Sequence, residues 1–236
     1  MRKLSLALAA GSLAACAAPA WDGEVVVHGS LQEALQSGQG EGRFALDSIK
    51  SQHAVGIGVL ENLAGEIVVY EGEVWTARAL SEGRVEVMRV ARPNEHAAFL
   101  ALSEVPEWRA FASLNELTLA TLEEALAALL EQAGIESSSG TPFAIEGELA
   151  ELEAHVIAGA CPQSGNPGPE PVRRRWQRVP ARLVGFFSRQ SSDALTPHGT
   201  RAHVHVVVAG AQPFVGHVDA VTIPARTRIL VPGSVD

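Results

Sequence analysis

The chain has 236 residues, of which 27 are acidic and 18 are basic, so its formal net charge is −9. Hydrophobic residues make up 47% of it and charged residues 19%, which is too apolar for a disordered chain. An acidic chain without clustered lysine and arginine lacks the phosphate contacts of a nucleic-acid-binding protein. Two cysteines are too few for a disulfide scaffold, and the length suits one large or two small domains.

The N-terminus is typical of an export signal. Two basic residues precede an apolar run over residues 4–15, which is shorter than the ~20 residues of a membrane-spanning helix. The run leads into Leu13-Ala14-Ala15-Cys16, which resembles a bacterial lipobox. We therefore expect residues 1–15 to be a lipoprotein signal peptide and Cys16 to be lipidated. The alternative is an ordinary signal peptide cleaved near residues 18 to 20. Either signal exports the protein, and the lipobox makes it a periplasmic or cell-envelope lipoprotein.

Residues 16–139 are predicted to form a first, sheet-containing domain. Ser30 and Glu33 can form a capping box for a short helix over residues 31–37. Several β-rich runs between turn signals then predict an antiparallel meander, with strands over 55–60, 65–70, 74–80 and 84–90. Thr121 to Glu124 is a second capping box, and the apolar residues that follow share one helical face. This pattern predicts a helix over residues 121–133.

Residues 140–236 are predicted to form a second, β-rich domain. We expect residues 142–152 to form a hairpin that turns near Glu146-Gly147, and the proline- and glycine-rich segment 161–171 to be irregular. The arginine run at residues 173–175 is by default a solvated surface run. The rest of the chain favours strands, over residues 181–188, 202–208, 214–223 and 226–231.

Three histidines carry the clearest chemical pattern. His203 and His205 alternate along one predicted strand, so both imidazoles lie on the same face. A turn at residues 210–213 allows His217, on the returning strand, to lie beside the pair. Three imidazoles on adjacent strands form a catalytic zinc site with an open position, and copper, iron or nickel also bind imidazole. One alternative is three histidines without a function. Another is a cupin, which would have a glutamate soon after the pair, where valines stand at 206–208.

Four segments of the chain follow one another in an order typical of a single enzyme family. They are His28–Leu35 (HGSLQEAL), Gly56–Glu66 (GIGVLENLAGE), Phe143–Leu149 (FAIEGEL) and His203–Val218, which contains the three histidines. Together they resemble the α-acetolactate decarboxylase family, whose corresponding motifs are GTL…L, GxGTxxxLxGE, FYAIRIDGEF and HxHF…GGHVLD. Each segment alone is a weak signal, but their shared order is fairly specific.

The resemblance implies a β-rich α+β fold, with a mixed sheet in the N-terminal part and an antiparallel, barrel-like sheet that carries the histidines. It implies a lyase that converts 2-acetolactate to acetoin and CO₂ on a Zn²⁺ ion held by His203, His205 and His217. Glu66 would be the family's active-site glutamate beside the metal. Such a zinc ion stabilises the negative charge that the departing CO₂ leaves behind, and a carboxylate can move the proton that completes acetoin. The partner would be a small 2-hydroxy-3-oxo acid, and a homodimer is a possible assembly.

The departures from the family motifs lie around the substrate rather than around the metal. His155 stands where the family has an arginine that can hold the substrate carboxylate, so we assign His155 to that catalytic position. The arginines at 173–175 can supply a substitute cation if the fold brings them near. A later catalytic glutamate of the family is missing, because 19 residues follow His217 and the last glutamate is Glu170. Val59 replaces a threonine, and the loop before His217 is one residue longer than usual.

Two main classes of function follow from this pattern. The first is an exported zinc lyase of the acetolactate decarboxylase type. The second is a non-catalytic metal- or small-molecule-binding envelope lipoprotein on the same fold. A third, weaker class is a structural envelope lipoprotein whose histidines have no function. In all three, contact with a membrane would be through a lipid anchor at Cys16 alone.

Overall fold

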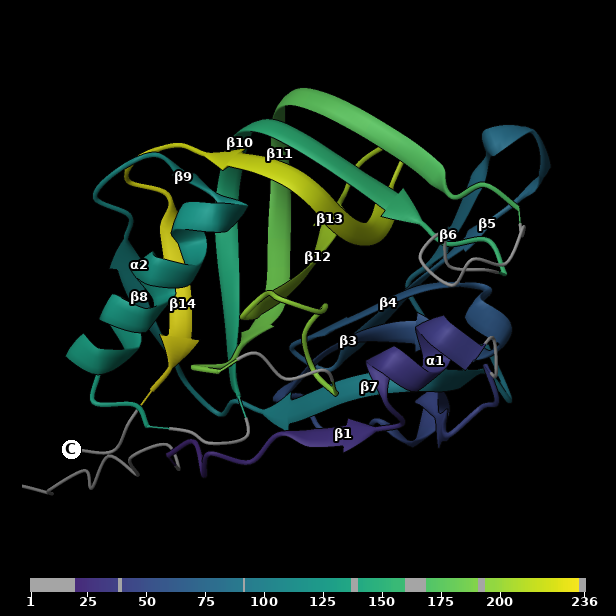
Figure 1. Ribbon diagram of the computed structural model, residues 1–236, viewed down its shortest axis with the longest axis horizontal. Coiled ribbons are helices and arrows are strands. Elements are labelled where there is room, and N and C mark those ends of the chain that lie inside the picture. Colours follow the sequence, from purple (N-terminus) through teal and green to yellow (C-terminus); the bar gives the residue numbers. More distant parts are fainter. Residues whose placement is uncertain are drawn as a thin grey trace, which may run out of the picture.

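The computed structural model describes residues 20–37, 40–90, 92–136, 140–159, 169–190 and 194–233. Within these residues the chain forms two seven-stranded sheets and two α-helices (Figure 1). This confirms the predicted β-rich α+β class. The first sheet differs from the resemblance, which implies a mixed sheet, because all of its described strand pairs are antiparallel. Tight turns join most of its successive strands, and such turns connect antiparallel neighbours.

The first sheet contains the predicted meander. Its strand order is β1-β7-β3-β4-β5-β6, and β2 pairs with β7. The strands are β1 Val26–His28, β2 Phe44–Ala45, β3 Ala54–Leu60, β4 Gly65–Tyr70, β5 Glu73–Ala79, β6 Val85–Met88 and β7 His96–Glu104. Three short 3-10 turns lie between them, namely η1 Leu46–Ser48, η2 Glu61–Leu63 and η3 Ser81–Gly83. Strands β3 and β4 are buried along their whole length and form the centre of the sheet.

The two helices differ in how well their caps are predicted. Helix α1 spans Leu31–Ser37 as predicted, and the Glu33 N–H donates to Ser30 Oγ at 3.4 Å. Helix α2 spans Leu119–Gln132 and begins earlier than predicted, because Thr118 is its N-cap and donates its N–H to Thr121 Oγ1 at 2.8 Å. The predicted cap at residues 121–124 does not form. Its Glu123 carboxylate instead accepts the backbone N–H of Arg201 at 2.8 Å.

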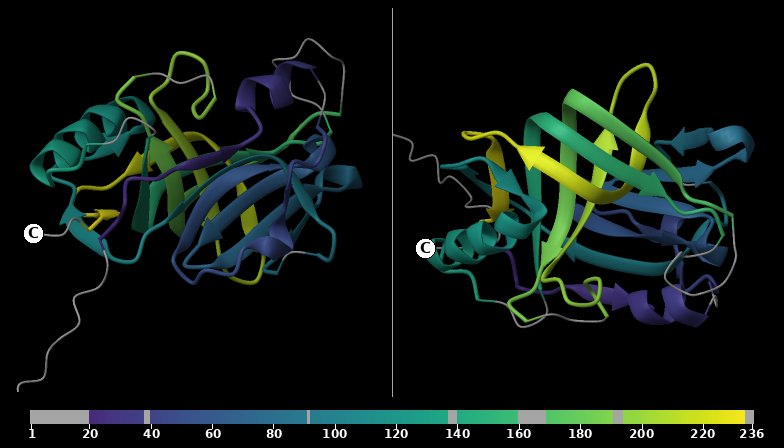
Figure 2. Two further views of the ribbon diagram at one scale, coloured as in Figure 1. Left: turned by 90° about the horizontal axis from the view of Figure 1, so that it is seen from below. Right: turned by 45° about the horizontal axis from the view of Figure 1, so that its top comes forward.

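The second sheet closes into the barrel that the resemblance implies. Its strands are β8 Trp108–Ala112, β9 Leu117–Thr118, β10 Thr141–Val156, β11 Val172–Phe187, β12 Ala202–Val208, β13 Phe214–Ile223 and β14 Arg228–Pro232. Their order is β8-β14-β10-β11-β12-β13-β9, and β13 also pairs with β10. The extra pairing closes the ring β10–β11–β12–β13. Figure 2 shows this green-to-yellow barrel beside the blue strands of the first sheet.

The predicted hairpin over residues 142–152 is wrong. These residues belong to one long strand, in which Gly147 pairs with Ala181 of β11 and the strand continues. The turn signal marks a change of neighbour instead, because residues 144–146 pair with β14 and residues 151–155 pair with β13. The arginine run at 173–175 is exposed, as predicted, but it lies inside β11 rather than in a loop.

One hydrophobic core joins the two sheets. It combines Ile57, Val68 and Phe99 of the first sheet with Phe143 and Val206 of the barrel, and with the buried face of α2. Strand β4 packs against β12 and β13, which brings the first sheet against the histidine-bearing strands. The chain passes from one sheet to the other between Glu104 and Trp108, and the division predicted near residue 139 stays a prediction. No helix of the described residues is both long and apolar enough to cross a membrane.

Candidate metal and catalytic site

Three histidines and one arginine lie in a single cross-strand row of the barrel. His205 of β12 pairs with His217 of β13. His217 pairs in turn with His155 of β10, and His155 pairs with Arg173 of β11. Residues directly opposite one another place their side chains on the same face of a sheet. His203 is two residues from His205 and shares that face, so the barrel gathers four imidazoles.

Glycine at position 216 allows this row to form. A Cβ atom at Gly216 would lie 2.5 Å from the His155 carbonyl oxygen and 2.6 Å from the Phe214 ring. Any side chain there would push β13 away from β10. The glycine that precedes His217 is therefore a requirement of the close pairing between His155 and His217.

His203 and His205 are held so that their Nε2 atoms face each other. His203 Nδ1 donates to the Leu195 carbonyl and His205 Nδ1 to the Ile67 carbonyl, each at 3.0 Å. A carbonyl only accepts, so both Nδ1 atoms carry the proton and both Nε2 atoms carry a lone pair. The two Nε2 atoms lie 3.2 Å apart in a fully buried site. Two nitrogen ligands of a tetrahedral zinc ion lie about 3.3 Å apart, so this spacing fits a bound cation.

The electrostatics of the pair favour metal binding. Burial, with a smaller contribution from the nearby His217, lowers the pKa of His203 to about 3, although the Leu195 carbonyl opposes the change. Burial also lowers the pKa of His205 well below its usual range, with smaller contributions from His203 and His217. Both rings are therefore neutral at pH 7, which is the form that binds a metal.

His217, the third predicted ligand, is less tightly associated with His203 and His205 than these two are with each other. Its ring centroid lies 5.3 Å from that of His203 and 5.6 Å from that of His205. Among the described residues, the triad whose ligand atoms all lie within 4.8 Å of one another is His155, His217 and Asp219. His217 therefore stands between the predicted pair and a second group of possible metal ligands. Burial lowers the pKa of His217 as well, although Asp219 opposes the change.

Glu66 reaches this cluster from the other sheet. It lies on β4 with 1% of its surface exposed, and its Oε1 accepts the Ile157 N–H at 3.2 Å. Its Oε2 lies 3.8 Å from His205 Nε2 and has no hydrogen-bond partner in the described part of the chain. Burial raises the pKa of Glu66 to about 7, although the charge of His155 and the Ile157 N–H lower it. The carboxyl group is therefore poised to gain and lose a proton near neutral pH.

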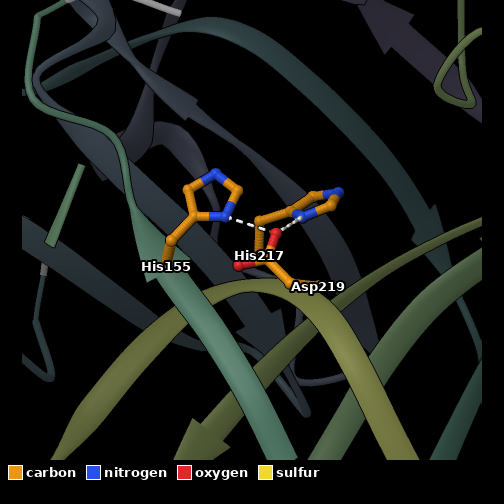
Figure 3. Close-up of side chains that lie close together, drawn as sticks. All are labelled: His155, His217 and Asp219. Atoms are coloured by element: carbon orange, nitrogen blue, oxygen red, sulfur yellow. Dashed lines mark hydrogen bonds and ion pairs between the residues drawn. The ribbon is translucent and has the colours of Figure 1, made fainter. Parts of the chain in front are cut away.

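The sequence pattern did not identify Asp219, and it named Arg173 only as one of three arginines that can supply a substitute cation. Asp219 Oδ1 accepts from His155 Nδ1 at 2.8 Å and lies 3.9 Å from His217 Nδ1 (Figure 3). Its Oδ2 accepts from Arg173 Nη1 at 2.6 Å. Burial alone would raise the pKa of Asp219, but the hydrogen bond from His155 and the nearby imidazole of His217 hold it well below its usual range. The only available sequence signal for Asp219 is its spacing of two residues from His217.

The other residues of interest lie elsewhere. Arg174 donates to the Gly83 carbonyl, and Arg175 forms an ion pair with Glu153, so the arginine that meets the cluster is Arg173. Val59 is buried in β3, in register with Glu66 on the adjacent strand. Cys16 lies outside the described residues.

A comparison with protein families identifies the chain. The sequence profile of alpha-acetolactate decarboxylase matches residues 26–231. The chain belongs to the α-acetolactate decarboxylase family. The match covers both sheets and every described residue of the cluster, so the four resembling segments are parts of one continuous similarity. No curated protein sequence matches the chain.

Solved structures show the same fold as this acetolactate decarboxylase family member. The α-acetolactate decarboxylase of Bacillus subtilis strain 168 is 15% identical with a TM-score of 0.66, over 89% of this chain and 86% of that chain. The acetolactate decarboxylase of Bacillus subtilis subspecies spizizenii gives the same values. A Staphylococcus aureus protein, described as similar to alpha-acetolactate decarboxylase and of unknown function, is 15% identical with a TM-score of 0.62, over 90% and 86%.

Proposed function

We propose that this family member is a metal-dependent carboxy-lyase that converts 2-acetolactate to acetoin and CO₂. The observation that carries the proposal is the facing pair of Nε2 atoms of His203 and His205, 3.2 Å apart, with the buried carboxyl of Glu66 beside it. A cation-binding pair of imidazoles next to an acid with a pKa of about 7 supplies the two functions that a decarboxylation of this kind needs.

His203, His205 and His217 would hold the metal, which we propose to be Zn²⁺. The donor set fits this ion, because zinc prefers neutral imidazoles and three of them leave a position for substrate. One buried side-chain atom of the site that faces the histidines, Glu66 Oε2, has no hydrogen-bond partner among the described residues. Buried polar atoms normally have partners, so this oxygen supports a site built around a further charged group. Bound zinc supplies a Lewis acid for the oxygen atoms of a 2-hydroxy-3-oxo acid.

Glu66 is proposed to move the proton of the reaction. When the bond between the carboxylate and the neighbouring carbon breaks, its electron pair delocalises onto the adjacent carbonyl oxygen as CO₂ leaves. The same carbon must then receive one proton to become the C–H group of acetoin. A carboxyl group with a pKa of about 7 holds this proton at neutral pH and releases it readily. Burial keeps the proton from exchanging with bulk water.

Arg173 is proposed to hold the carboxylate end of the substrate, beside His155, which stands at the position of the family's arginine and donates to the same Asp219. A guanidinium group has five N–H donors in a planar fork, and Arg173 gives one of its two Nη groups to Asp219. Its side chain is 49% exposed, which leaves room for a ligand. The cation that the family places on β10 would thus lie on the neighbouring strand β11, opposite His155.

The deciding experiment measures acetoin released from racemic 2-acetolactate by the zinc-loaded protein. Glu66→Gln should lower kcat by about 10²- to 10⁴-fold, and Glu148→Gln, which changes an exposed carboxylate on β10, should not. His205→Ala should lose the bound zinc of the wild type. A wild-type protein that contains zinc but releases acetoin no faster than the spontaneous reaction would show that the proposed activity is wrong.

A second candidate function is a non-catalytic metal- or small-molecule-binding role. It is favoured by one observation, the presence of His155 on β10 at the position of the family's arginine. This function predicts stoichiometric zinc and ligand binding without acetoin. The same experiment therefore separates the two candidates.

We also propose that the protein is exported and anchored to the envelope through a lipid on Cys16. The lipobox-like sequence at residues 13–16 supports this proposal. Metabolic labelling with a radioactive fatty acid should mark the wild type, and Cys16→Ser should remove the label. A labelled Cys16→Ser variant would contradict the anchor.

A further inference from the structure

Asp219 owes its position to a β-bulge. In the pairing of β13 with β10, Val218 lies opposite Ala154 and Ala220 lies opposite Glu153, so Asp219 is the extra residue without a partner. A bulge of this kind re-aims a side chain and is frequent beside active sites. Here it brings one carboxylate to the Nδ1 edges of two neighbouring imidazoles, as Figure 3 shows.

The carboxylate faces both rings from the same side. Oδ1 lies 2.8 Å from His155 Nδ1 and 3.9 Å from His217 Nδ1, while Oδ2 is fixed by Arg173 at 2.6 Å. An ionised carboxylate only accepts hydrogen bonds, so His155 Nδ1, which lies at hydrogen-bond distance, carries the proton. His217 Nδ1 lies at ion-pair distance, where the negative charge favours the protonated Nδ1. The Nε2 atom of each ring then carries the lone pair. The carbonyl groups of Leu195 and Ile67 impose the same tautomer on the other two histidines.

We propose that Asp219 is a positioning residue that fixes the Nδ1–H tautomer of His155 and His217 and thereby keeps His217 ready to bind the metal through Nε2. A carboxylate behind a histidine ligand orients the ring and makes it a stronger base, and its loss typically costs 10- to 100-fold in metal affinity. Arg173 holds this carboxylate in place from the next strand but one. The metal-binding part of the inference rests on the proposed function, whereas the tautomer part does not.

The first test reads the tautomers in the metal-free protein. Long-range ¹H–¹⁵N NMR spectra at pH 8, assigned with His155→Gln and His217→Gln, should show the Nδ1–H form for both rings of the wild type. Asp219→Ala should shift both rings towards the Nε2–H form. Glu153→Ala is the matched control, because Glu153 is a carboxylate next to the same bulge that pairs with Arg175 instead. Unchanged tautomers in Asp219→Ala would overturn the inference.

The second test measures zinc affinity by competition with a chelator. Asp219→Ala should bind zinc about 10 to 100 times more weakly than the wild type, and Glu153→Ala should bind it equally well. Asp219→Asn, which keeps the shape of the side chain, should also bind zinc more weakly and guards against a folding defect. Equal zinc affinity in both Asp219 variants would overturn the metal-binding part. If the wild type itself binds no zinc, the proposed function fails, and the tautomer measurement decides the inference alone.

Discussion

At the scale of single residues, the histidines of the site differ in the group that faces the Nδ1 atom of each ring. His203 and His205 have their tautomers set by main-chain carbonyl groups, which belong to the fold and cannot be removed by changing a side chain. His217 instead faces Asp219, a side chain on its own strand. Side-chain mutations near His203 and His205 therefore leave their tautomers unchanged. A mutation of Asp219 can change the tautomer of His217.

Arg173 predicts a specific kinetic defect. Arg173→Ala should raise KM for 2-acetolactate by about 10- to 100-fold with a smaller change in kcat, because a contact to the carboxylate binds substrate and transition state alike. The matched control is Arg175→Ala, which changes the arginine two residues further along β11 that pairs with Glu153. His155→Ala should raise KM by a smaller factor, because His155 and Arg173 hold the same Asp219 carboxylate and the loss of His155 frees Arg173 to move. If neither His155→Ala nor Arg173→Ala changes KM, the assignment of the carboxylate end is wrong.

Glu66 predicts a pH-dependent stability of the metal-free protein. Folding raises its pKa from 4.5 to about 7, so the folded protein binds more protons than the unfolded chain between these values. The contribution of Glu66 to stability is thus fully present below pH 4.5 and is lost as the pH rises through 7. Relative to Glu66→Gln, the wild type should lose about 3 kcal/mol in its free energy of unfolding over this range.

The difference between these two proteins is the quantity to measure by urea unfolding at several pH values. The buried histidines have lowered pKa values and act in the opposite direction, since their folded state binds fewer protons and gains stability as the pH rises. Subtracting the variant removes their effect. A difference that stays constant between pH 4.5 and 8 would show that Glu66 is not a buried acid in solution.

At the scale of elements, the histidine-bearing strand β12 is tied at its start to helix α2. Glu123 of the helix accepts the N–H groups of Arg201 and Ala202, which immediately precede His203. It also pairs with the Arg201 side chain at 3.3 Å. The helix begins at Leu119 instead of at the predicted cap because Thr118 and Thr121 cap it one turn earlier, which leaves Glu123 free for this contact. The Glu123 contact is tertiary, and no local pattern reveals it.

Removal of the Glu123 carboxylate should destabilise the start of β12. Glu123→Ala should lower the free energy of unfolding by about 1 to 3 kcal/mol, because it leaves two partly buried N–H groups without their acceptor. Glu124→Ala is the matched control, since Glu124 pairs with the same Arg201 but is 78% exposed and should contribute about 0 to 1 kcal/mol. Chemical denaturation measures both. Equal losses in the two variants would contradict the tie.

The strands also show which parts of the fold and of the site could be predicted from the sequence. Alternation in HVH and the turn after it were enough to place His205 and His217 on paired strands, because a period of two fixes the face of a side chain. The strand β10 was missed, because Glu146-Gly147 has the composition of a turn, whereas pairing with β11 on both sides of these residues carries the strand through them. Asp219 was missed because a bulge adds a residue without any composition signal.

At the scale of the whole molecule, the two sheets share one core and one site. The core runs from the first sheet through the barrel to α2, and Glu66 crosses from β4 to the histidines of β12. The family resemblance implied that Glu66 lies beside the metal-site histidines. Composition and periodicity alone do not place these residues together. Glu66 lies next to the histidines only when the two sheets are packed against each other.

A shared core predicts cooperative unfolding. Urea should unfold the protein in one transition, with the same midpoint for tryptophan fluorescence and for far-ultraviolet circular dichroism. Trp75 in the first sheet and Trp176 in the barrel allow each half to be followed separately in single-tryptophan variants. Two transitions, or different midpoints for Trp75 and Trp176, would instead support two domains, as predicted with a division near residue 139.

The two strand pairs of the barrel carry different proposed roles, metal binding and contact with the substrate carboxylate. The hairpin β12–β13 carries His203, His205 and His217, whereas the long pair β10–β11 carries His155 and Arg173. If both proposed roles hold, a mutation on β10 or β11 changes which acid is accepted while the hairpin proposed to bind the metal keeps its sequence. The replacement of the family's arginine by His155 has this character. In this arrangement the barrel allows substrate preference to change independently of the proposed metal ligands.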